Sequence, residues 1–357
     1  MIVAITGASA GVGRATAREF AKRGWDVAVL ARNAARLEAT AEEIRQHGVR
    51  ALPIPVDVAD FSALDAAATR VESELGPIDI WINNAMATVF APVRKITADE
   101  FRRGTEVTYL GQVHGTMAAL ARMRPRDRGT IVNIGSALAY RAIPLQSVYC
   151  GAKYAVRGFT DALRSELLHE GSAIKLVMVQ LPAVNTPQFD WALNKMGRRS
   201  RPVPPVYQPE AAARAIVFAA THPSRREVWF GPSTMEAILA NRVVPGVLDR
   251  YLATAGYEGQ LTDEPLPADA PVNLFTSVDG DFAAHGRFDK EARSRSAMAS
   301  VTRHPGITLA AIAGLAGLVM AKWLKSAQPT MVGTAAARRP LQRGRRPTKR
   351  ASPWVDQ

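Results

Sequence analysis

Short apolar segments and amphipathic helical patterns alternate along this chain from residue 2 to about residue 235. The apolar segments have the composition of strands, and between them the apolar residues recur with the period of a helix. This alternation is typical of a parallel sheet whose two faces are both covered by helices. The predicted strands are Ile2–Thr6, Asp26–Ala31, Ala51–Pro55, Ile78–Asn83, Thr130–Ile134, Lys175–Leu181 and Glu227–Phe230.

A glycine-rich turn follows the first predicted strand. Its glycines are Gly7, Gly11 and Gly13, and the helical pattern that comes next ends at Gly24. A strand, a glycine loop and a helix in this order place a phosphate group at the N-terminus of the helix. Glycine-rich turns are common, so the loop alone is weak evidence. Together with the alternation it predicts an α/β fold: a single Rossmann-type doubly wound parallel sheet of about seven strands, followed by a C-terminal helical and irregular extension.

A serine, a tyrosine and a lysine form a candidate catalytic set. Tyr149 and Lys153 are four residues apart, and they therefore share one face of a helix. A neighbouring cation favours the phenolate and lowers the pKa of a tyrosine from its usual ~10. Ser136, just after a predicted strand, would hold the oxygen of a carbonyl or alcohol. A Tyr-x-x-x-Lys pair alone is usually a solvated pair, but behind a glycine loop this set predicts proton transfer at a carbon–oxygen bond.

These motifs, in this order, resemble those of the short-chain dehydrogenase/reductase family over roughly residues 1 to 235. The glycine signature of that family matches Thr6 to Gly13, and its Asn-Asn-Ala element matches Asn83 to Ala85. The resemblance implies that Ser136, Tyr149 and Lys153 are catalytic. It also implies these cofactor-binding residues, among which Asp57 would meet the adenine: Gly7, Ser9, Gly11, Val12, Gly13, Asp57, Val58, Asn84, Ala85, Tyr149, Lys153, Pro182 and Thr186.

Two positions depart from the pattern of the family. Thr108 stands where the family has a fourth catalytic residue, an asparagine that holds a water in the proton relay. We interpret Thr108 as the corresponding catalytic position, with its hydroxyl holding a water instead. Met86 replaces a glycine and is expected to narrow the pocket beside the nicotinamide.

The end of the second predicted strand indicates which cofactor is bound. NAD-binding sheets usually carry an acidic residue there, whereas a basic residue suits the 2′-phosphate of NADP. This chain has Arg32 and no acid at that point, and Arg14 follows the glycine loop. A guanidinium pairs well with phosphate, although Arg32 in a loop can also be merely solvated. We therefore predict NADP(H) as the cofactor, held in part by Arg32 and Arg14.

The sequence predicts an oxidoreductase that interconverts a carbonyl and an alcohol on an apolar, lipophilic substrate. A lid over Asn185 to Pro209 contains Phe189 and Trp191, and Leu138 and Ile143 follow Ser136. Such an apolar wall is usual for small-molecule pockets. The competing hypothesis is a catalytically weak NADP-binding sensor or scaffold protein associated with the membrane.

Composition places the enzyme in a reducing compartment. Cys150 is the only cysteine, which excludes an internal disulfide and fits the cytoplasm. The six histidines show no ligand spacing, so no metal is expected. A strand already begins at residue 2, so no signal peptide is expected either.

The chain beyond residue 235 leaves the family pattern. We divide the whole chain into a catalytic domain (1–235), a helical and then irregular C-terminal arm (236–304), a hydrophobic helix (305–325) and a basic disordered tail (326–357). Residues 307–321 include no charged residue. The length of this segment is marginal for a membrane span, which needs about 20 residues. A membrane segment and a buried docking helix both fit this pattern.

The tail concentrates positive charge. Residues 322–357 hold nine Lys/Arg and one Asp, and so contribute +8 of the net charge of +13. Beside a hydrophobic segment, this charge favours contact with an anionic membrane surface through residues 305–357. No folded motif supports nucleic-acid binding. The family resemblance also implies a homodimer formed through the helices that carry Thr108 and Tyr149.

Overall fold

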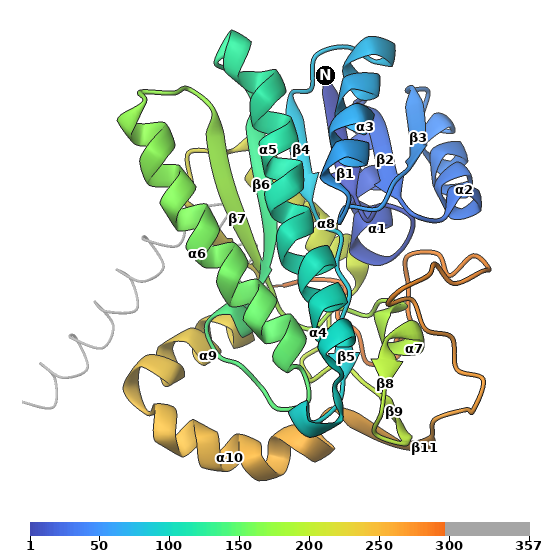
Figure 1. Ribbon diagram of the computed structural model, residues 1–357, viewed down its shortest axis with the longest axis vertical. Helices are drawn as coiled ribbons and strands as arrows, with labels where there is room; N and C mark the ends of the chain where they lie inside the picture. The colour runs from blue at the N-terminus through green and yellow to red at the C-terminus, as the bar shows by residue number, and fades with distance from the viewer. Residues whose placement is uncertain (297–357) are drawn as a thin grey trace, which may run out of the picture. The chain divides into compact units, whose positions relative to one another are not determined.

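The computed structural model describes residues 1–296, and its centre is a seven-stranded sheet in which every pairing is parallel (Figure 1). The strand order is β10-β7-β6-β4-β1-β2-β3. All seven predicted strands are present and the predicted fold class is confirmed, although β4 begins two residues later than expected and β6 continues to Ser136. The strands are β1 (Ile2–Thr6), β2 (Asp26–Ala31), β3 (Ala51–Pro55), β4 (Ile80–Asn83), β6 (Thr130–Ser136), β7 (Lys175–Leu181) and β10 (Glu227–Trp229).

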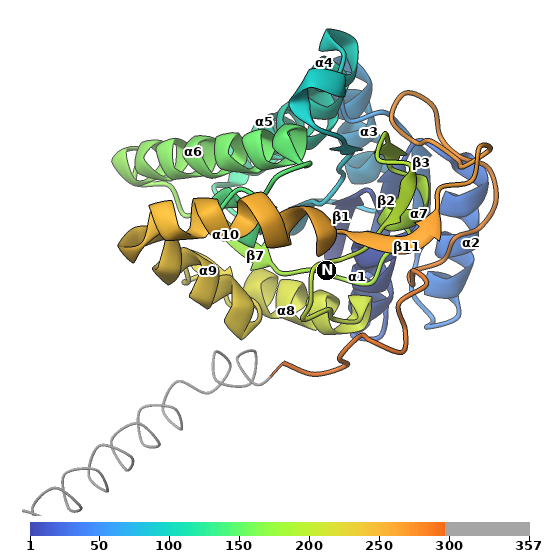
Figure 2. The same cartoon turned by 90° about the horizontal axis from the view of Figure 1, so that it is seen from below.

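Helices cover both faces of the sheet, as Figures 1 and 2 show. Alternate residues of β1 separate the two cores, since Val3 and Ile5 pack on one face while Ile2 and Ala4 pack on the other. One face is covered by α1 (Gly11–Ala21), α2 (Ala34–Arg45) and α8 (Pro209–Thr221). The other is covered by α3 (Phe61–Glu74), α5 (Gly111–Met123) and α6 (Ser147–His169).

A buried polar network ties the middle of the sheet to α5 and α6. The side chain of Asn83 accepts from the indole of Trp81 at 2.8 Å and donates to Thr116 at 2.9 Å and Asn133 at 2.8 Å. Asn133 in turn donates to Thr160 at 2.9 Å. Each of these side chains is almost fully buried. A satisfied network of this kind fixes one arrangement of strands and helices, because a shifted register would leave its groups unpaired.

Small elements close the carboxyl end of the sheet. The short helix α4 (Ala98–Thr105) leads through a π-helical turn (Glu106–Leu110) into α5. The segment after β7 forms α7 (Gln188–Trp191), β8 (Leu193–Asn194) and β9 (Arg198–Ser200). Strand β8 pairs with β5 (Val89–Phe90), so this segment is attached to the loop that follows β4. The remaining short turns are 3-10 helices at Val93–Lys95, Arg124–Arg126 and Ala137–Ala139.

The C-terminal arm begins with two helices, α9 (Pro232–Val243) and α10 (Pro245–Glu258), and Val244 separates them. Strand β11 (Leu261–Pro265) then pairs antiparallel with β9. The chain continues without regular structure, passing beside α2 and β3 and returning toward α1 and α8 (Figures 1 and 2). All of these residues belong to one compact unit with the sheet.

The predicted hydrophobic segment and basic tail lie outside the described residues. Within residues 1–296, none of the helices has the length and apolar character needed to cross a membrane.

Candidate active site

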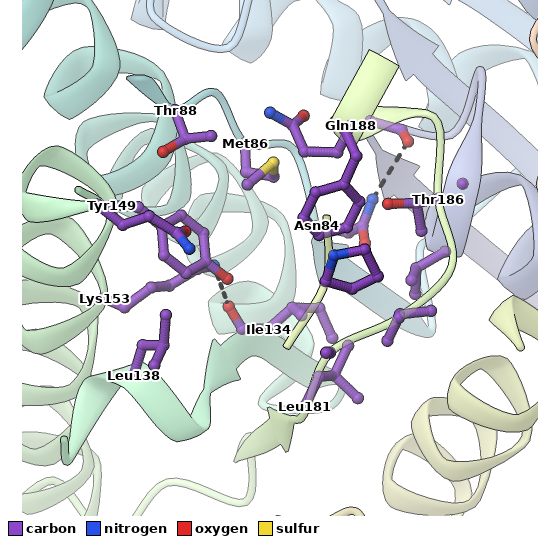
Figure 3. Close-up of a pocket in the computed structure, with 18 of the residues that line it drawn as sticks. Asn84, Met86, Thr88, Ile134, Leu138, Tyr149, Lys153, Leu181, Thr186 and Gln188 are labelled. Atoms are coloured by element: carbon purple, nitrogen blue, oxygen red, sulfur yellow. Dashed lines mark hydrogen bonds between the residues drawn. The ribbon is translucent and has the colours of Figure 1, made fainter. Parts of the chain in front are cut away.

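A cavity of about 600 Å³ opens at the carboxyl ends of the central strands. Figure 3 shows Tyr149 and Lys153 on one side of it and Asn84 and Thr186 on the other. Residues separated by more than a hundred positions therefore meet at one edge of the sheet. The predicted cofactor residues that line this cavity are Gly7, Ser9, Gly11, Val12, Arg32, Asp57, Val58, Asn84, Ala85, Tyr149, Lys153, Pro182 and Thr186.

The glycine loop has the close packing that a dinucleotide cradle needs. Gly7 has a φ of +67°, and a Cβ built on it would lie 2.7 Å from the Cα of Ala85. A Cβ on Gly13 would lie 2.2 Å from the backbone oxygen of Gly7. Side chains are excluded at both positions, so the loop folds tightly against the start of α1. Gly13 does not line the cavity and acts through this packing.

The start of α1 is suited to an anion. Ala10 precedes the helix and gives no side-chain cap, and the first turn carries no acidic residue. The first N–H groups of a helix lack partners inside the helix, and the helix dipole favours negative charge there. In α1 the first of them, that of Gly11, donates to the oxygen of Ala283 at 3.1 Å. Together with Gly7 and Gly13, this end of the helix fits the pyrophosphate of a nicotinamide dinucleotide.

The catalytic set is assembled from β6 and α6. The Nζ atom of Lys153 donates to the backbone oxygen of Ile134 at 2.6 Å, and it lies 5.5 Å from the centre of the Tyr149 ring. Ser136 ends β6, and its Oγ accepts from the backbone N–H of Leu138 at 3.1 Å. The Ser136 hydroxyl also bonds the phenol of Tyr149. The three residues singled out from the sequence therefore meet in space.

Burial shifts the pKa values of both titratable members of this set. Lys153 is 2% exposed, and burial lowers the pKa of its amine from 10.5 to about 7. Burial raises the pKa of Tyr149 to about 12, although the hydrogen bond with Ser136 opposes this shift. The sequence had led us to expect a lowered pKa for Tyr149, whereas burial raises it. Removal of the phenolate from water is the largest cause of this rise.

Thr108 does not reach the cavity. Its side chain is fully buried, and its hydroxyl donates to the Ala87 oxygen at 2.7 Å and accepts from the Ala87 N–H at 2.9 Å. Both bonds link the π-helical turn to the loop after β4. The hydroxyl is engaged by the backbone, so the structure gives Thr108 a structural role in place of the water-holding role that we expected.

Gln112 is a site residue that the sequence reading missed. It lies one turn after Thr108, is 1% exposed, and donates to the Ile134 oxygen at 3.0 Å. The same oxygen accepts from Lys153. Gln112 therefore helps to hold the acceptor that positions the lysine. A glutamine in a helical pattern carries no local signal of such a role, because the contact spans 22 residues of sequence.

The two arginines assigned to the cofactor have different surroundings. Arg32 lines the cavity as expected, and its guanidinium donates to three consecutive backbone oxygens of the arm, those of Asn273, Leu274 and Phe275. Arg14 does not line the cavity, because it is 2% exposed and is paired with Glu43 and Asp281. The structure therefore brings Arg32 to the site and leaves Arg14 outside it.

The other half of the cavity is mostly apolar. Met86, Leu138, Ile143 and Phe189 line it, as expected from the sequence, whereas Trp191 lines the cavity beside Arg36. Helices α9 and α10 add a wall that we did not anticipate, made of Ala237, Ala240, Leu248, Tyr251 and Leu252. The sequence showed only that these segments are helical, and long-range packing decides which of their side chains face the site.

Comparisons with known proteins agree with this geometry. The profile of the short chain dehydrogenase family matches residues 1–196. The uncharacterized oxidoreductase YxnA of Bacillus subtilis is 30% identical over 327 residues, which cover 90% of each chain. Mouse dehydrogenase/reductase SDR family member 7 is 35% identical over 171 residues, 47% of this chain and 51% of that protein. The chain belongs to the short-chain dehydrogenase/reductase family, and it is an oxidoreductase that acts on alcohol or carbonyl groups.

A solved structure supports the same assignment. The alcohol dehydrogenase of the archaeon Thermococcus sibiricus, complexed with 5-hydroxy-NADP, matches with a TM-score of 0.55 and 25% identity. The match covers 64% of this chain and 94% of the dehydrogenase.

Proposed function

We propose that this chain is an NADP(H)-dependent reductase or dehydrogenase of lipophilic carbonyl or alcohol substrates. The main support for this cofactor preference is the position of Arg32, which follows β2 and lines the cavity. An NAD-specific sheet would have an acidic residue at this position. A guanidinium at this position attracts the 2′-phosphate of NADP through charge and hydrogen bonds. Its interaction with the uncharged 2′-hydroxyl of NAD is much weaker. The T. sibiricus dehydrogenase, whose structure contains an NADP derivative, is consistent with this preference.

The substrate class follows from the wall opposite the glycine loop. Met86, Leu138, Ile143 and Phe189 line the same cavity as Tyr149, and Leu252 adds apolar surface from α10. Arg201 also lines the cavity, but it is paired with Glu291 at 2.5 Å. The pocket therefore favours apolar substrate bodies over anionic ones.

Tyr149, Ser136 and Lys153 have different roles in the proton transfer. A bound nicotinamide supplies the hydride in the reductive direction. Tyr149, with a pKa of about 12, is protonated at neutral pH and donates its proton to the carbonyl oxygen. Ser136 hydrogen-bonds the same oxygen as negative charge develops on it. Lys153 lies next to the Tyr149 ring, where its protonated form would stabilise the phenolate that remains.

The test is steady-state turnover of the purified protein with NADPH and with NADH, against a panel of aliphatic and aromatic ketones and aldehydes. We expect kcat/KM to be about tenfold or more higher with NADPH, which corresponds to at least about 1.4 kcal/mol from the 2′-phosphate. Arg32→Glu should reverse the preference, because it restores an acid at the end of β2. Comparable turnover with both cofactors would show that the assignment of NADP(H) is wrong.

A further inference from the structure

Two arginines that line the cavity have no carboxylate partner within residues 1–296. Arg32 and Arg36 both line the cavity. Arg32 is bonded only to backbone oxygens, and the Nε and Nη1 atoms of Arg36 have no hydrogen-bond partner. By contrast, the neighbouring Arg14 and Arg103 form ion pairs, the latter with Asp57. The cavity therefore contains two cations whose charge is not neutralised by a direct contact.

The burial of these two groups is unfavourable without an anion. Arg36 is 6% exposed, and burial lowers its pKa, although Asp281 and Asp279 partly offset this through space. Burial also lowers the pKa of Arg32, with a partial offset from Asp57. Taking a charge out of water costs free energy unless a counter-charge is placed beside it. A dianionic ligand between the two guanidinium groups would provide that counter-charge.

A segment of the arm, residues 273–282, forms the outer wall of this space, and we call it the strap. Leu274 anchors the strap, because its side chain is fully buried and its oxygen accepts from Nε of Arg103 at 3.1 Å. Ser277, which belongs to the strap, lines the cavity. The oxygen of Val278 accepts from the side chain of Asn33, the residue that caps α2, at 3.2 Å.

The strap also fixes the orientation of Arg36. The guanidinium of Arg36 lies 4.9 Å from the Trp191 ring and 5.8 Å from the Phe282 ring, and these rings contact each other edge to face at 4.7 Å. Immediately after the strap, the oxygen of Ala283 accepts from the N–H of Gly11 at 3.1 Å. Together, these contacts connect the strap and the residue after it to the glycine loop, the end of β2 and α7.

We propose that Arg36 and Ser277 complete, together with Arg32, a closed pocket for the 2′-phosphate of the cofactor, and that the strap is the wall that closes it. The inference rests on the proposed dependence on NADP(H) and assigns two further residues to it. In this arrangement the three arm oxygens orient Arg32, while Arg36 supplies free N–H donors and Ser277 a hydroxyl.

The test uses two ligands that differ only in the 2′-phosphate: adenosine 2′,5′-bisphosphate and 5′-AMP. Calorimetric binding to the full-length protein needs no substrate and no turnover. We expect the wild-type protein to bind the bisphosphate at least about tenfold more tightly. Arg36→Gln should reduce this ratio about fivefold or more, and Ser277→Ala about twofold to threefold. Arg45→Gln is the matched control, since Arg45 lies on the same helix, is exposed and carries the same charge.

The outcomes separate this inference from the proposed function. A wild-type ratio near one would refute the NADP(H) preference itself. A high wild-type ratio that persists in Arg36→Gln and Ser277→Ala would overturn the pocket proposed here and leave Arg32 as the phosphate ligand.

Hydrogen exchange tests the strap without any substitution. In the wild-type protein, the bisphosphate should slow exchange of the amides in residues 273–282 more than 5′-AMP does, because the 2′-phosphate contacts the strap directly. Equal protection by the two ligands, or faster exchange with the bisphosphate, would contradict the closed pocket even if Arg36→Gln fails to fold.

Discussion

Lys153 places its Nζ atom 2.6 Å from the backbone oxygen of Ile134, with 2% of its residue surface exposed. The oxygen belongs to β6 and the lysine to α6, so this contact joins the sheet to the helix that carries Tyr149. One backbone oxygen does not replace the water that a free ammonium group would bind. The lowered pKa of Lys153 is the consequence.

The burial of Lys153 makes the stability of the protein depend on pH. The unfolded chain keeps this proton up to about pH 10.5, whereas the folded protein releases it near pH 7. The contribution of Lys153 to the free energy of unfolding therefore rises between these two values, since the unfolded state binds more protons. Below pH 7, burial of the charged amine costs several kcal/mol relative to the neutral amine, at about 1.4 kcal/mol per pKa unit.

Lys153→Met should therefore be more stable than the wild-type protein at pH 6, by up to that amount, and the difference should shrink steadily toward pH 10. The measurement is urea unfolding of both proteins at several pH values, in which the titrations common to both cancel. A difference that stays constant with pH would mean that Lys153 is not buried as a titrating group.

Tyr149→Phe should remove turnover and leave cofactor binding nearly intact. Loss of the proton donor is expected to lower kcat by about 10²–10⁴-fold, while the phenyl ring keeps the shape of the pocket. The measurement combines steady-state kinetics with calorimetric titration of NADPH. Turnover within a few-fold of the wild-type rate would refute the role of Tyr149 as the proton donor.

Thr108→Val should destabilise the fold more than it impairs the chemistry. The valine keeps the shape of threonine but leaves the N–H and oxygen of Ala87 without their partner. An unpaired buried polar group costs about 1–3 kcal/mol, so the free energy of unfolding should fall by about 2 kcal/mol or more. Thr108→Ser keeps the hydroxyl and is the control, expected to lose less. A stable Val variant with a hundredfold loss of kcat would restore the relay role that the sequence suggested.

Gly13→Ala and Gly151→Ala should have opposite effects on stability. A Cβ at position 13 would collide with the oxygen of Gly7, whereas no atom lies within 4 Å of a Cβ at position 151 in α6. Gly13→Ala should lower the free energy of unfolding by about 1–3 kcal/mol and weaken binding of 5′-AMP. Gly151→Ala should raise it by about 0.5–1 kcal/mol, because alanine is favoured over glycine inside a helix. Equal unfolding free energies for the two variants would contradict the tight packing of the glycine loop.

The strands and the catalytic set could be predicted because their signals are local. Each strand of the central sheet is a short apolar run between helical patterns, so Ile2–Thr6 and Lys175–Leu181 were found at their observed bounds. Ser136, Tyr149 and Lys153 were recognised by type, spacing and order along the chain. Parallel strands bring their carboxyl ends to one edge, so even the meeting of these residues with the glycine loop followed from the alternation.

The roles of individual polar groups could not be predicted in the same way. The pKa of Tyr149 depends on burial, which is a property of the whole fold, and it moved opposite to the direction expected from Lys153. Thr108 is engaged by Ala87, 21 residues away, and Arg14 by Asp281, 267 residues away. Nothing in the sequence near either residue marks these partners.

The amino-acid sequence by itself determined the sheet, the glycine loop, the reaction class and the absence of an acid after β2, because each depends on residue types at short, regular spacings. Only the tertiary structure decided that Arg14 is neutralised outside the site, that Arg36 faces the cavity without a counter-charge, and that the arm closes the cavity around Arg32. The contacts with the arm join residues more than 200 positions apart. All of these energies depend on desolvation and on partners that meet only when the chain is folded.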